Sequence, residues 1–70
     1  MSVHEEIYEQ FCEWLPEYMP EIKEYKPWGS TSIVIWLKNG LIYKVKRFAP
    51  HKFIMQMVSK EDVERKFNNK

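Results

Sequence analysis

Apolar residues in the first part of the chain recur at intervals of three and four, which is the spacing of one face of an α-helix. Ser2 and Glu5 form a capping box at the start of this stretch, whereas Pro16 cannot occupy a helix interior. The pattern therefore predicts a helix over residues 2–15 whose glutamates face water. The apolar stripe consists of Val3, Ile7, Phe11, Leu15 and Tyr18.

Residues 16–30 are predicted to form a proline-rich connector. Pro16 and Pro20 are each followed by a glutamate, a combination that suits the first turn of a short helix. We therefore expect one or two helical turns within residues 16–25, followed by a linker into a sheet.

A hairpin is indicated by Asn39-Gly40, which separates two apolar runs rich in β-branched and aromatic residues. The runs predict strands over residues 31–37 and 41–48. The length of the loop decides which side chains share a face, because a shift of one residue reverses every side chain of a strand.

Two loop lengths are compatible with this hairpin. A two-residue loop would place Ile33 opposite Lys46, whereas a three-residue loop places Ile33 opposite Val45. Burying a lysine costs far more than the difference between two turn types. We therefore expect a three-residue loop, 38–40, with Gly40 in the left-handed conformation.

Two further elements complete the predicted fold. Residues 53–58 are expected to form a third strand, and Ser59 caps a short helix over residues 59–68 with Val63 and Phe67 facing inward. This helix is too short to persist alone and must dock on the sheet. The prediction is a single small α+β domain over residues 1–70, in α-β-β-β-α order, with a three-stranded antiparallel meander. The N-terminal helix packs on one sheet face.

The predicted sheet has an unusually apolar second face. The core face, under the N-terminal helix, takes Ile33, Ile35, Leu37, Leu41, Tyr43, Val45, Phe53, Met55 and Met57. The other face shows Val34, Trp36, Ile42, Lys44, Lys46, Phe48, Ile54, Gln56 and Val58, too apolar for a solvated face. Either residues 16–28 or the C-terminal helix cover this face, or a partner does.

The charged residues are distributed unevenly along the chain, which the net charge of +1 does not show. Residues 1–27 hold seven glutamates against two lysines, a net −5. Residues 28–70 hold nine lysines and arginines against three acidic residues, a net +6. Such a dipolar surface indicates something about partners and nothing about the fold.

We expect a non-enzymatic protein-binding module, of the accessory or inhibitory regulator type, that engages another protein or a second copy of itself. The binding surface would be the acidic helix or the apolar and basic sheet face. The residues predicted to bind the protein partner are Val34, Trp36, Ile42, Lys44, Lys46, Phe48 and Ile54.

The alternative function is nucleic-acid binding, in which aromatic rings stack on bases while cations contact phosphates. This set comprises Trp36, Lys44, Lys46, Arg47, Phe48 and Lys52. No recognised nucleic-acid motif accompanies these residues.

The sequence contains few residues that could act in catalysis or bind a metal ion. The only histidines and cysteine are His4, His51 and Cys12, fewer than the four ligands of a structural zinc site. We expect His4 to be solvated, Cys12 to be a small buried hydrophobe and His51 to lie in an inert turn. No cofactor and no small-molecule substrate are expected.

The location expected from the sequence is the cytoplasm. Cys12 is alone, which favours a reducing compartment, and charged residues precede any apolar run at the start of the chain. No apolar stretch approaches the roughly 20 residues that cross a bilayer, so no membrane is expected.

Overall fold

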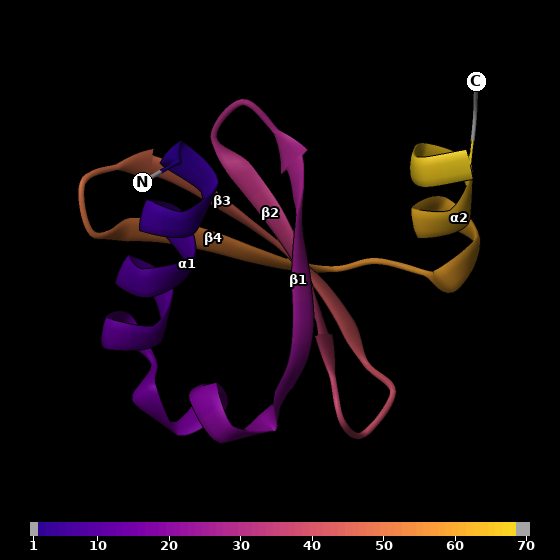
Figure 1. The fold of residues 1–70 in the computed structure, drawn as a ribbon, viewed down its shortest axis with the longest axis horizontal. Coiled ribbons are helices and arrows are strands. Elements are labelled where there is room, and N and C mark those ends of the chain that lie inside the picture. The colour runs from indigo at the N-terminus through magenta and orange to yellow at the C-terminus, as the bar shows by residue number, and fades with distance from the viewer. Residues whose placement is uncertain (1, 69–70) are drawn as a thin grey trace.

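The computed structural model describes residues 2–68 as a four-stranded antiparallel sheet with one helix on each face (Figure 1). The strand order is β1-β2-β3-β4, a simple meander. The elements are α1 (Val3–Trp14), the 3-10 helix η1 (Pro16–Glu21), β1 (Ile22–Gly29), β2 (Ser32–Leu37), β3 (Ile42–Ala49), β4 (Lys52–Met57) and α2 (Lys60–Asn68).

The prediction of three strands is wrong, because the predicted connector 16–30 contains β1 as well as η1. Ile22, Tyr25 and Trp28 are spaced by three, which hides the strand period of two. The pairing of β1 with β2 has irregularities at both ends, and each adds a residue that breaks the alternation. Pro27 is tolerated because β1 is an edge strand. The expected helical turns are present as η1.

Both predicted helix caps are present. The Glu5 backbone N–H donates to Ser2 Oγ at 3.1 Å, and the Asp62 backbone N–H donates to Ser59 Oγ at the same distance. α1 ends where Leu15 N–H donates to the Phe11 carbonyl, directly before Pro16. Capping, together with the proline stop, explains the bounds of α1.

The three-residue hairpin loop is confirmed. Ile33 pairs with Val45, and Ile35 pairs with Tyr43. Gly40 has a φ of 95°, and its N–H donates to the Leu37 carbonyl at 3.0 Å. Lys44 consequently lies opposite Val34, on the sheet face away from α1.

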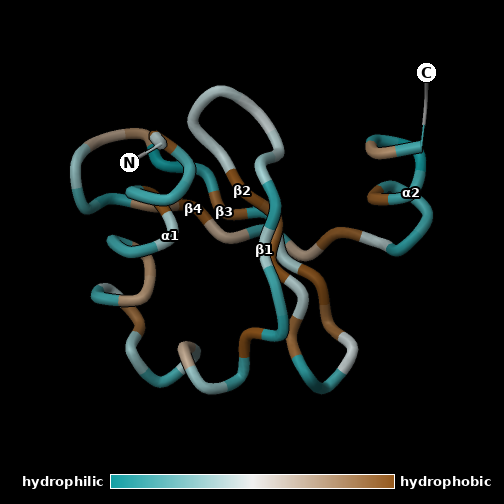
Figure 2. The backbone as a smooth tube through the Cα atoms, viewed as in Figure 1, coloured by the Kyte–Doolittle hydropathy of each residue, from teal (hydrophilic) through white to brown (hydrophobic). Residues whose placement is uncertain are grey.

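The main core lies between α1 and the sheet. Its fully buried side chains come from both layers, and β2 contributes the densest hydrophobic run, whereas β1 is mostly hydrophilic (Figure 2). Phe53 packs edge-on against Phe11 and stacks on Trp14. The buried cluster is Ile7, Phe11, Ile33, Ile35, Leu37, Val45 and Phe53.

Leu41 and Met57 were predicted in the core but are exposed, Met57 to 60%. The β2–β3 hairpin projects away from α1 in Figure 1, and Met57 pairs with Tyr43 near this end of the sheet. A helix of 12 residues spans only about 18 Å, and the contacts of α1 with Gly29 and Arg47 lie toward the opposite end of the sheet from this hairpin. Both side chains therefore lie beyond its reach.

Polar contacts attach α1 to the sheet at two points. His4 Nε2 donates to the Gly29 carbonyl at 2.6 Å, so the expected solvated role of His4 is wrong. Arg47 Nη1 donates to Glu6 Oε1 at 2.8 Å and to Gln10 Oε1 at 3.0 Å. These contacts set the direction in which α1 crosses the strands.

One stability prediction concerns the turn between β3 and β4. His51 has a φ of 62° there, a conformation that costs a non-glycine residue about 1 kcal/mol. We expect His51→Gly to raise the free energy of unfolding by about 0.5–1 kcal/mol in urea titrations. Lys52→Gly, at a strand position, is the control and should destabilise the protein. Equal destabilisation by both variants would contradict the prediction.

Candidate functional site

The second face of the sheet is partly covered by α2. Val34 and Ile42 are buried against Val63 of α2, and Trp36 is partly buried against the same cluster. The sequence left two explanations for this apolar face, cover by the chain itself or by a partner. The C-terminal helix covers one half of the face. Three of the predicted partner-binding residues, Val34, Trp36 and Ile42, are not available to a partner in this arrangement.

An aromatic cluster holds α2 in place. Phe67 packs edge-on against Trp28 with ring centroids 5.9 Å apart, and its ring lies 6.2 Å from that of Trp36. Two lysines lie over these rings. Lys26 Nζ is 5.7 Å from the Trp36 centroid, and Lys66 Nζ is 5.6 Å from that of Trp28. The cations and rings stabilise each other at the rim of the α2 layer.

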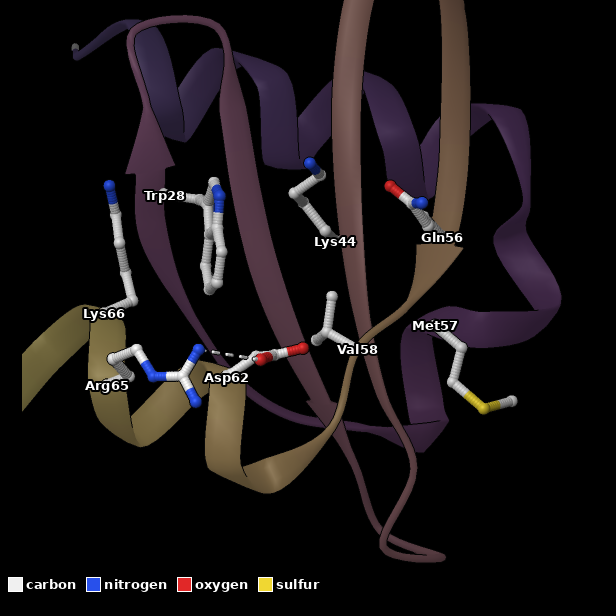
Figure 3. A pocket seen from close by; sticks show the side chains of 8 residues that line it. All are labelled: Trp28, Lys44, Gln56, Met57, Val58, Asp62, Arg65 and Lys66. Atoms are coloured by element: carbon white, nitrogen blue, oxygen red, sulfur yellow. Dashed lines mark ion pairs between the residues drawn. The ribbon is translucent and has the colours of Figure 1, made fainter.

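Beside this cluster, the sheet and α2 enclose a groove of about 580 Å³ (Figure 3). One wall is formed by side chains from β1, β3 and β4, and the other by the exposed side of α2. The lining residues are Trp28, Lys44, Gln56, Met57, Val58, Asp62, Arg65 and Lys66.

The groove is cationic. Lys44, Arg65 and Lys66 contribute three positive charges against the single carboxylate of Asp62. Arg65 Nη1 lies 3.7 Å from Asp62 Oδ1, and both side chains are more than half exposed. An exposed pair of this kind contributes little and leaves Arg65 able to reach a ligand. The groove can therefore hold an anionic group, with an amide from Gln56 as a further hydrogen-bonding partner.

The exposed surface continues from the groove along β3 and β4. Lys46 pairs with Ile54, whose side chain is 54% exposed, and Phe48 is 57% exposed near the end of β3. Four of the predicted partner-binding residues thus remain accessible or partly so, namely Lys44, Lys46, Phe48 and Ile54.

The residues predicted to bind nucleic acid do not form one surface. Arg47 lies on the α1 side, where its guanidinium contacts Glu6 and Gln10, and its side chain is only 19% exposed. Trp36 lies under α2. The exposed Phe48 and Lys52 remain with Lys44 and Lys46. The set therefore loses one of its two stacking rings and one of its cations.

The cations on the α2 side of the groove were not among the residues predicted to bind a partner. In the sequence, Arg65 and Lys66 follow Glu61 and Asp62 at a spacing of four, which favours ion pairs along the helix surface. The structure instead pairs Arg65 with Asp62 and places Lys66 over Trp28. The sequence did contain a signal that these side chains lie close to the sheet. Asp62 and Lys66 directly precede Val63 and Phe67, which were predicted to face inward.

Cys12 lies on α1, beside a second, shallower depression of about 490 Å³ that Tyr8, Glu9 and Glu13 also line. The Tyr8 ring stacks on Tyr25 with centroids 4.1 Å apart. Burial raises the pKa of the Cys12 thiol above its ordinary 9.0, and the neighbouring Tyr8 opposes this shift. Burial is also the main cause of a raised Tyr8 pKa. A thiol of raised pKa is a poor nucleophile at neutral pH.

Comparisons with known proteins add nothing to this geometry, because the chain matches no protein-family model, no curated protein and no solved structure. Within residues 2–68, no group of three His, Cys, Asp or Glu side chains could hold a metal ion. The described helices are too short and too polar to cross a membrane.

The docking of α2 yields a prediction for Phe67→Ala. Loss of this half-buried ring should lower the free energy of unfolding by about 2 kcal/mol. Because Phe67 contacts Trp28 and Trp36, we also expect a red shift of tryptophan emission in the folded state. Phe48→Ala is the matched control and should change stability by less than about 0.5 kcal/mol. An unchanged emission spectrum of Phe67→Ala would argue against this packing.

A pH dependence follows from the raised pKa of Cys12. The thiol ionises at a lower pH in the unfolded chain than in the folded protein, so the free energy of unfolding falls as the pH rises above 9.0. We expect this fall to be shallower in Cys12→Ala, with urea titrations at each pH as the measurement. Tyr8 contributes with the same sign above pH 10.0. Equal slopes for the two proteins would show that the thiol does not contribute.

Proposed function

We propose that this chain is a non-enzymatic protein-binding module that holds an acidic, partly apolar segment of a partner protein in the groove between the sheet and α2. The observation that carries the proposal is the excess of cations in the groove, directly beside accessible apolar side chains on β3 and β4. A role as an accessory or inhibitory regulator in the cytoplasm fits this size and charge layout.

Both parts of the surface contribute to the proposed recognition. Lys44 lies on the sheet side of the groove and Arg65 on the α2 side (Figure 3), and both cations attract carboxylates. Ile54 offers apolar area beside them, and apolar anchors supply most of the energy at protein interfaces. The charges steer the encounter and select acidic partners.

A protein segment fits this surface better than a single-stranded nucleic acid. Stacking of successive bases needs several free ring faces. Trp28 and Trp36 already pack against Phe67 and lie close to lysine ammonium groups, and the exposed ring of Phe48 lies four residues along β3 from Lys44. Nucleic acid is therefore the competing ligand in the test.

The test uses a fluorescein-labelled peptide in which Glu alternates with Leu, and fluorescence anisotropy as the readout. The wild-type protein should bind this peptide more tightly than its Gln-for-Glu analogue and more tightly than oligo-dT. Replacing both Lys44 and Arg65 by Gln should weaken binding about tenfold, because each exposed charge contact contributes up to about 1 kcal/mol.

Lys38→Gln is the matched control, since Lys38 is an exposed lysine of the hairpin loop outside the groove. It should leave the affinity within about twofold of wild type. Tighter binding of oligo-dT with a steep salt dependence would overturn the proposal in favour of nucleic acid. Equal losses of peptide affinity in Lys38→Gln and in the double variant would show that the groove is not the binding site.

A further inference from the structure

The outer edge of β4 is unpaired among the described residues. β4 is the last strand in the order β1-β2-β3-β4, and residues 2–68 supply no strand beyond it. Its six residues include no proline, glycine or acidic residue. An edge strand of this kind presents a row of free backbone N–H and C=O groups to any other strand.

The direction of these backbone groups follows from the ladder with β3. Val58 N–H donates to the Ile42 carbonyl, and hydrogen-bonding residues alternate along an antiparallel strand. Residues 54, 56 and 58 therefore bond toward β3. Phe53, Met55 and Met57 point their N–H and C=O groups away from the sheet.

Exposed apolar side chains flank this edge on both faces of the sheet. Met57 is 60% and Ile54 is 54% exposed. Trp14, which stacks on Phe53, remains 44% exposed. A monomer leaves this apolar area in water together with the free backbone groups.

The opposite edge of the sheet carries the usual protection against strand pairing. β1 contains Pro27, three charged residues and two register irregularities. β4 has only Lys52 at its turn end, and its one irregularity lies beside that turn. The unprotected edge is thus specific to β4.

β4 is also complementary to itself. An antiparallel two-fold arrangement centred on Met55 pairs Met55 with its own copy and Phe53 with Met57. All three outward-pointing residues then form hydrogen-bonded pairs, each of which exchanges two bonds. On the other face, Ile54 lies opposite Gln56, and neither residue carries a charge that pairing would bury. Met57 of the second copy would lie beside Phe53 and Trp14, which covers the exposed indole.

We propose that the occupant of this edge is a second copy of the chain, and that β4 pairs with β4 to form a symmetric dimer with a continuous eight-stranded sheet. A six-residue strand pair with a few flanking side chains buries an area near the lower end of stable interfaces, about 1,000 Å². We therefore expect the dissociation constant of the dimer to lie in the micromolar range. The proposal does not rest on the partner proposed for the groove, although Met57 and Ile54 belong to both surfaces.

The first experiment is sedimentation equilibrium of the full chain from about 5 µM to about 1 mM, where the mass should rise from 8.6 kDa toward twice that value. The second is amide hydrogen exchange at both limits of this range. The outward-pointing amides of Met55 and Met57 should exchange at least about tenfold more slowly at the higher concentration.

Met57→Lys tests the edge directly, because lysine on an edge strand opposes pairing. It should raise the dissociation constant at least about tenfold, since the substitution acts twice in a symmetric dimer. Met19→Lys is the matched control, at an η1 methionine that is 56% exposed, and it should leave the constant unchanged.

A mass of 8.6 kDa over the whole concentration range would overturn the proposal. A dimer in which the Met55 amide exchanges at the same rate at both concentrations would also overturn it, because the dimer interface would then lie elsewhere. Equal weakening by Met57→Lys and Met19→Lys would have the same consequence. The exchange measurement uses the wild-type chain and does not depend on the folding of any variant.

Discussion

The register of the β2–β3 hairpin determines which side chains each helix can pack against. With Gly40 in the left-handed conformation, Ile33 and Ile35 point toward α1, whereas Val34 and Lys44 point to the other face. A shift of one residue would place Lys44 and Lys46 on the same face as Ile33 and Ile35, so that packing these isoleucines would bury the lysines. Both helices would then lose the surface on which they pack.

The two helical layers differ in how firmly they are attached. α1 packs on the larger buried cluster, and His4 and Arg47 attach it to the sheet through hydrogen bonds. α2 is held mainly by Val63 and Phe67, which rest on a smaller cluster. Because this second layer covers only part of its face, it leaves a groove whose charges come from both the sheet and the helix.

Much of the fold could be predicted because its signals are local. The helix caps at Ser2 and Ser59, the stop at Pro16 and the loop at Gly40 each depend on a few adjacent residues. β1 could not be predicted in this way, because its irregular pairing with β2 produces an apolar spacing of three. The groove was half predicted, since Lys44 was identified and the cations of α2 were not.

Which side chains of the central hairpin share a face follows from the sequence alone, since the other register would bury a lysine. The sequence also determined that the second face was too apolar to be left in water. What covers that face depends on tertiary contacts, because Phe67 and Trp28 meet across a long stretch of chain and no local period records such a contact. Tertiary packing likewise places β1 at one sheet edge and β4 at the other, with no strand beyond β4 among residues 2–68.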